Sequence, residues 1–289
     1  MRLVQFASIT KKMALAAVGL FLLLFLPVHL GINLCILRED QGEWYRIASH
    51  FMGTNYIVKV FEVVLMATIL LHIVIALLLT LENLRARPVR YKVVTKSKTH
   101  FMSKYMIWTG GIIAVFLVIH FINFYFVKLD IVEGKYSAKL EQIDQHFQAK
   151  AKLMQNGELK EDEQTKLVAQ YQALSNISPD KVDAKGKNLI NLSKEEVVQY
   201  CGEDFKHVEP DFYVMSKDFF KNKYYSLLYL LSFIVLGLHL MHAINSLAQT
   251  FGLSHTKYNN AIEIFAIAYS IIIPLGFAII PIAIMFFGY

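Results

Sequence analysis

Four histidines lie deep inside long apolar segments of the sequence, one in each of four segments. They are His29, His72, His120 and His239. An ionisable side chain at that depth in a bilayer costs a few kcal/mol unless it faces a partner. One such residue is compatible with an ordinary core histidine, but four on separate segments indicate a shared role. Paired imidazoles from facing helices can hold the iron of a haem b on both sides.

Membrane-spanning helices must position these histidines, because the chain is strongly apolar. Of its 289 residues, 55% are hydrophobic, and the mean hydropathy is +0.42. About 20 apolar residues cross a bilayer, and five runs reach that length: roughly Met13 to Leu37, Tyr56 to Leu81, Tyr105 to Val127, Tyr225 to Gln249 and Ile262 to Phe287. The first run is too long for the hydrophobic region of a signal peptide and lacks a cleavage site near its end. The sequence therefore predicts an all-α integral membrane protein with five transmembrane helices.

A polar insert separates the third predicted helix from the fourth. We expect transmembrane helices in residues 1–127 and 224–289, and an extramembrane helical insert in residues 128–223. Amphipathic stretches around Lys139 to Met154 and Glu161 to Leu174 flank a turn at Asn156-Gly157. A shorter helix is expected to begin with a capping box at Ser193 and Glu196 and to end at Gly202.

The loop between the second and third helices sets the orientation. It contains seven basic residues and no acidic one between Asn83 and Tyr105. The positive-inside rule places this loop in the cytoplasm. The N-terminus is then cytoplasmic, whereas the insert and the C-terminal Tyr289 lie on the outer side.

The depths of the four histidines predict two pairs. Counted from the helix midpoints, His29 and His120 lie about four residues towards the outside, and His72 and His239 lie about two or three residues towards the cytoplasm. At 1.5 Å per residue the two levels are roughly 9 Å apart. We therefore expect an outer haem b held by the first pair and an inner haem b held by the second, in a four-helix dihaem core.

Two glycines and a fifth histidine belong to the predicted haem environment. Gly19 and Gly110 each precede the outer ligand of their helix by ten residues, which puts them about 15 Å further in, near the inner haem. Small-residue contact between helices is the alternative explanation for both. The fourth helix offers two candidate ligands, and His239 is preferred to His242 because it matches His72 in depth. His242 lies one turn further in, where it would donate to a haem propionate or face water.

The sequence resembles the cytochrome b558-type dihaem anchor of succinate dehydrogenases and fumarate reductases, a family with five transmembrane helices. The matching residues are Ser8 to Lys12, Gly19, His29 to Asn33, Phe51 to Asn55, Glu62, His72, Arg87, Pro88, Tyr91, Ser103, Met106, Thr109, Gly110, His120, His239, His242, Ser246, Gln249, Thr250 and Gly252. The sequence departs from the family at Ala243, where glycine is common, and in the length of the insert. The family pattern implies the same ligand pairs and a quinone, usually menaquinone, near the outer haem.

The resemblance also implies partners and a location. A flavoprotein subunit and an iron–sulfur subunit, both on the cytoplasmic face, would interconvert succinate and fumarate, and the complex would sit in the bacterial inner membrane, where complexes can pair as dimers. No nucleic acid is expected as a partner. The insert would act as a lid over the quinone entrance, as a docking face for another subunit, or as a solvated addition without a role.

Five further residues are assigned by position. Glu62 lies ten residues before His72, about 15 Å further out, where it would take part in proton transfer or quinone binding; an ion pair with Lys59 is the alternative. Four residues at the cytoplasmic interface could hold propionates of the inner haem. For the basic residues among them, the positive-inside rule alone is the alternative explanation. These four are Ser8, Lys12, Arg87 and Ser103.

The only cysteines of the sequence are Cys35 and Cys201, and they form no C-x-x-C motif. Iron–sulfur, zinc-ribbon and c-type haem sites are therefore not expected in this chain. The two cysteines would either pair as a disulfide or be two unrelated thiols.

Two other functions are compatible with the buried histidines. A cytochrome b anchor of a hydrogenase or formate dehydrogenase would share them. A transporter with a histidine proton relay would share them too, but would be colourless.

Overall fold

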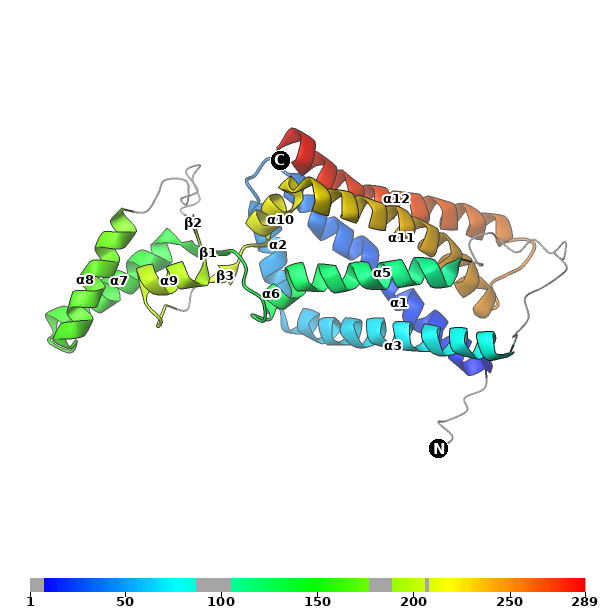
Figure 1. The fold of residues 1–289 in the computed structure, drawn as a ribbon, viewed down its shortest axis with the longest axis horizontal. Coiled ribbons are helices and arrows are strands. Elements are labelled where there is room, and N and C mark those ends of the chain that lie inside the picture. Colours follow the sequence, from blue (N-terminus) through cyan, green and yellow to red (C-terminus); the bar gives the residue numbers. More distant parts are fainter. Residues whose placement is uncertain (1–7, 87–104, 177–188, 206–207, 289) are drawn as a thin grey trace, which may run out of the picture. The chain divides into compact units, whose positions relative to one another are not determined.

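The computed structural model describes residues 8–86, 105–176, 189–205 and 208–288. The described chain is mostly helical, and five of its helices are long and apolar enough to cross a membrane (Figure 1). These helices cover Ile9–Leu37, Tyr56–Ala86, Met106–Lys128, Lys223–Thr250 and Asn259–Phe287. The predicted all-α class with five apolar helices, typical of a multi-pass membrane protein, is confirmed.

The elements follow one another as a series of helices interrupted by three short strands. The helices before the insert are α1 (Ser8–Leu34), η1 (Cys35–Leu37), α2 (Glu43–Thr54), α3 (Tyr56–Ala86), α5 (Met106–His120), the π-helical turn η2 (Phe121–Tyr125) and α6 (Phe126–Lys128). The remaining elements are β1 (Tyr136–Lys139), α7 (Leu140–Gln155), α8 (Glu161–Ser175), β2 (Leu189–Leu192), α9 (Lys194–Cys201), β3 (Glu209–Pro210), α10 (Phe212–Lys221), α11 (Lys223–Thr250) and α12 (Asn259–Phe287).

The chain forms two compact units. One, here called the helical unit, contains residues 1–118 and 219–289; the other, the insert unit, contains residues 119–218. The long helices α1, α3, α11 and α12 and most of α5 belong to the helical unit. The sheet and helices α7 to α9 belong to the insert unit.

Helices α11 and α12 pack tightly because small residues let their backbones approach. A Cβ atom added to Gly237 would lie only 2.7 Å from the carbonyl oxygen of Ser270, a separation that no real side chain could keep. Further along α12, a Cβ at Gly276 would lie 2.7 Å from Leu30 of α1. The hydroxyl of Tyr269 also donates a hydrogen bond to the carbonyl of Leu23 in α1. These contacts fix α12 against both neighbours.

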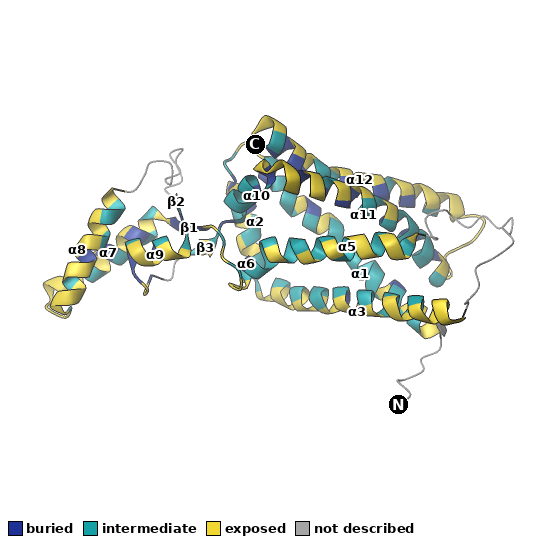
Figure 2. Cartoon of the chain, viewed as in Figure 1, coloured by how far each residue is buried: buried dark blue, intermediate teal, exposed yellow. Residues whose placement is uncertain are grey.

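The long helices present large apolar side chains on their outer surfaces. Val63 and Leu70 on α3, Val115 on α5 and Ile272 on α12 are each more than 60% exposed, and Figure 2 shows exposed residues along the whole length of these helices. In water such continuous apolar surface would be an interaction or aggregation site. In a bilayer it is the surface that contacts lipid.

The insert unit has its own hydrophobic core beneath a small sheet. Strand β1 pairs antiparallel with β2 and β3, in the order β2-β1-β3, with Tyr136 opposite Leu192. Ile143 and Phe147 of α7, Leu167 of α8 and Cys201 of α9 fill the core. This sheet was not predicted from the sequence, because strands of two and four residues are too short to show an alternation of apolar and polar residues.

Local signals placed the insert helices correctly. The Ser193 side chain accepts from the backbone N–H of Glu196 at 3.2 Å, and the Glu196 carboxylate accepts from the N–H of Ser193 at 2.9 Å, as the predicted capping box requires. Gly157 and Gly202 have φ angles of 74° and 92°, a left-handed region that favours glycine. The turn and the helix end therefore lie where the sequence indicated.

Both cysteines are free thiols. Cys201 has no exposed surface, and burial raises the pKa of its thiol to about 11. Cys35 is half-buried, with its Sγ 3.5 Å from the carbonyl oxygen of Gly31. Of the two alternatives, unrelated thiols therefore describe this structure.

Candidate histidine site in the helical unit

His72 of α3 and His239 of α11 face each other inside the helical unit. Their ring centroids are 6.4 Å apart and the ring planes are inclined by 67°. Metal–imidazole nitrogen bonds are about 2 Å long, and each ring nitrogen lies roughly 1 Å from its ring centre. Two imidazoles on opposite sides of one metal therefore have centroids about 6 Å apart. The observed separation fits a metal ion between the two rings.

Bare backbone from two further helices lies beside these rings. A Cβ atom at Gly19 of α1 would lie 3.7 Å from Cε1 of His72, and one at Gly110 of α5 would lie 3.5 Å from Cε1 of His239. Four helices thus contribute to one level of the unit. Gly19 and Gly110 were predicted from their depth to lie near His72 and His239, and the structure brings these four residues together.

The ring nitrogens of the two histidines have different partners. The Thr109 hydroxyl lies 3.3 Å from Nδ1 of His239 and 3.0 Å from the carbonyl oxygen of Met106. Nδ1 of His72 is buried and has no hydrogen-bond partner among the described residues. A buried polar atom without a partner calls for an unplaced ligand or water. In the sequence, Thr109 is only one of the residues that match the family, and its contact with His239 was not predicted.

His29 lies on α1 among aromatic rings. Its imidazole stacks on Phe25 with centroids 5.1 Å apart and lies 5.6 Å from the ring of Phe277. The Asn33 side-chain amide donates to the carbonyl of His29 at 2.8 Å, and its nitrogen lies 3.4 Å from Nδ1 of the ring. His29 is therefore half-buried beside aromatic rings, with Asn33 of its own helix as a polar neighbour.

His120 ends α5 at the start of the insert unit. The five residues that follow it form the π-helical turn η2, and its ring lies 5.4 Å from that of Phe124. Single π-helical turns are frequent at functional sites. Because His120 and His29 belong to different units, their pairing stays a prediction.

The remaining predicted site residues lie on the same helices or outside the described chain. Glu62 is half-buried on α3, ten residues before His72, and His242 is half-buried one turn beyond His239. Lys12 is exposed on α1, whereas its neighbour Lys11 forms an ion pair with Glu82 of α3. Three further residues carry no side-chain description. Ser8 begins α1, and Arg87 and Ser103 lie outside the described residues.

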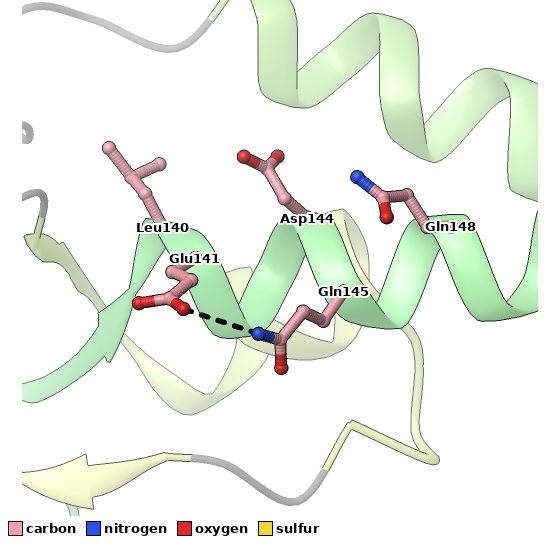
Figure 3. A pocket seen from close by; sticks show the side chains of 5 residues that line it. All are labelled: Leu140, Glu141, Asp144, Gln145 and Gln148. Atoms are coloured by element: carbon pink, nitrogen blue, oxygen red, sulfur yellow. Dashed lines mark hydrogen bonds between the residues drawn. The ribbon is translucent and has the colours of Figure 1, made fainter.

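The insert unit contains a recess that is a second candidate site. It is lined by residues of α7 alone, and the Gln145 amide donates to the Glu141 carboxylate at 3.3 Å (Figure 3). The other lining residues are Leu140, Asp144 and Gln148. Functional pockets gather polar groups from several elements. This recess does not, so the histidine site is the stronger candidate.

Comparisons of the chain with protein-family models, with curated proteins and with solved structures found no match.

Proposed function

We propose that this chain is the dihaem cytochrome b anchor of a succinate:quinone oxidoreductase or quinol:fumarate reductase. The observation that carries the proposal is the facing pair His72 and His239, at a separation suited to one metal between them. Two facing imidazoles supply only two ligands. A porphyrin would supply the other ligands of the iron, and it would need flat space between the helices.

The surroundings of Gly19 and Gly110 favour a flat cofactor beside them rather than direct packing between two helices. In a small-residue contact the glycine meets another helix backbone, as Gly237 does at 2.7 Å from the Ser270 carbonyl. Gly19 and Gly110 behave differently. Among the described residues beyond their own helix backbone, only the imidazoles of His72 and His239 lie within 4 Å of their added Cβ atoms. Bare backbone beside a ligand ring leaves room for a porphyrin edge.

In the proposed protein His72 and His239 hold the inner haem b, and His29 and His120 hold the outer one. A haem with two imidazole ligands has no open coordination position and supplies one-electron transfer. Each ligating nitrogen must be unprotonated, and the surrounding apolar side chains exclude water. Lys12 and His242 would be partners of the propionates of the inner haem.

The substrate in the membrane is a quinone, for which menaquinone is the leading candidate. Oxidation of a quinol releases two protons, so the chain needs an acceptor near the outer haem. Glu62 is half-buried on α3, and one helical segment of ten residues places it about 15 Å from His72 along the axis. A carboxylate within an apolar helix is expensive unless it has a role or a partner. Glu62 is our proposed proton acceptor.

The proposed partners are a flavoprotein subunit and an iron–sulfur subunit on the cytoplasmic side of the bacterial inner membrane. Their presence can be tested by purifying the tagged chain from its native host in mild detergent. The expected complex is coloured, contains flavin and iron–sulfur centres, and oxidises succinate with a quinone or reduces fumarate with a quinol. A complex with a nickel or molybdenum enzyme would reassign the anchor to a hydrogenase or formate dehydrogenase. A colourless protein would favour the transporter alternative.

A further inference from the structure

We propose that Thr109 is a positioning residue that fixes the tautomer of His239. In this arrangement the Thr109 oxygen accepts a hydrogen bond from Nδ1–H of His239, so that Nε2 carries the lone pair that binds iron. The inference rests on the proposed function, because it assigns a ligating role to His239. It adds a residue on α5 that controls a ligand on α11.

The direction of the hydrogen bond follows from the two neighbours of the hydroxyl. A threonine hydroxyl has one hydrogen to donate and two lone pairs to accept with. The Met106 carbonyl at 3.0 Å can only accept, and helical threonines commonly donate to the carbonyl one turn back. The Thr109 hydrogen is then committed to Met106. The Thr109 oxygen can then only accept a hydrogen bond from Nδ1 of His239, which lies 3.3 Å away.

An acceptor at Nδ1 determines the chemistry at the other nitrogen. A neutral imidazole has one N–H, so a proton held at Nδ1 leaves Nε2 unprotonated and able to bind a metal. Partners of this kind fix the ring orientation of metal-bound histidines and raise the basicity of the ligand. A more basic ligand stabilises oxidised iron more than reduced iron. Thr109 therefore lowers the reduction potential of the haem that His239 holds.

The opposite ligand lacks this support. Nδ1 of His72 has no hydrogen-bond partner among the described residues, so the two rings facing each other are not equivalent. Removing the Thr109 hydroxyl would make His239 resemble His72. The change acts on one haem only, because Thr109 lies on the same level as the His72 and His239 pair, next to Gly110.

The test compares Thr109→Val, which keeps the side-chain shape without the hydroxyl, with Thr109→Ser, which keeps the hydroxyl. Both variants are purified as the intact complex, and the midpoint potentials of the haems are measured by redox titration together with their low-spin electron paramagnetic resonance spectra. We expect Thr109→Val to raise one midpoint potential, to change one low-spin signal, and to leave the other haem unaltered. Thr109→Ser should retain both wild-type values. Loss of that one haem in Thr109→Val, with retention in Thr109→Ser, would support the same role.

Several outcomes would overturn the inference. Identical potentials and spectra in Thr109→Val and wild type would show that the hydroxyl does not act on His239. Equal shifts or equal haem loss in Thr109→Val and Thr109→Ser would assign the effect to packing. A wild-type complex without haem would instead refute the proposed function, so the two failures are distinguishable.

Discussion

The size of the side chain at position 110 offers a direct test of space beside His239. An alanine Cβ at Gly110 would lie 3.5 Å from Cε1 of the imidazole, which is ordinary contact, so Gly110→Ala should keep both haems. In Gly110→Leu the branch methyls extend roughly 2.5 Å beyond Cβ, since each carbon–carbon bond adds about 1.5 Å. They would occupy the space next to the ring. Overpacking of this kind costs about 1–3 kcal/mol, equivalent to roughly 5- to 150-fold weaker haem binding.

The neighbouring glycine supplies a matched control for this substitution. Gly111 is on the same helix and is exposed, and no atom of the described residues beyond its own helix backbone lies within 4 Å of its added Cβ. Haem per polypeptide is measured in the purified complexes by pyridine haemochrome absorbance. We expect Gly110→Leu to fall from two haems towards one and Gly111→Leu to keep two. The reasoning is refuted if Gly110→Leu retains two haems or if both leucine variants lose haem equally.

Three further predictions concern packing, thiol reactivity and acid stability. Gly237→Ala should lower the thermal unfolding temperature of the detergent-solubilised protein, because its Cβ would meet the α12 backbone at 2.7 Å; an unchanged temperature would mean that the helices separate freely. A maleimide at neutral pH should label Cys35 and spare Cys201, whose buried thiol has a pKa of about 11, so labelling that survives Cys35→Ser would contradict the described core. The hydrogen bond from Lys194 lowers the pKa of the Asp130 carboxyl. The pair therefore stabilises the folded protein at pH values above the carboxyl pKa of the unfolded chain, which is about 3.9. This stability is lost as the pH falls through the carboxyl pKa of the folded protein. In the wild type we therefore expect residues 136–139 to lose hydrogen-exchange protection as the pH falls, after correction for intrinsic exchange, and we expect Lys194→Met to show no such loss. An equal loss in both proteins would exclude the Asp130–Lys194 pair as its cause.

The membrane helices were predictable because the bilayer imposes a simple requirement on sequence. Some 20 consecutive apolar residues are needed to cross it, and all five runs became helices. Depth along a helix follows from the same count. It was enough to put His72, His239, Gly19 and Gly110 on one level, where the structure brings them together.

Contacts that depend on helix rotation or on distant pairing were not predictable in this way. Whether Thr109 or a neighbour meets His239 depends on how α5 is turned about its axis, which residue counting does not specify. The pairing of β1 with β2 joins Tyr136 to Leu192, and strands this short have no pattern that identifies a partner. Capping residues in the insert were readable because Ser193 and Glu196 act within one turn.

The central claim is that His72 and His239 hold one and the same haem. It is tested most directly by reduced-minus-oxidised spectra and haem quantification of His72→Ala, His239→Ala and their double variant. Ile234→Ala, at an exposed position of the same helix α11, is the control. We expect the wild-type complex to contain two haems b, and both single variants and the double variant to lack the same spectral component and retain one haem, whereas Ile234→Ala keeps two. A wild-type complex that binds no tetrapyrrole, or single variants that lose different components, would contradict the account.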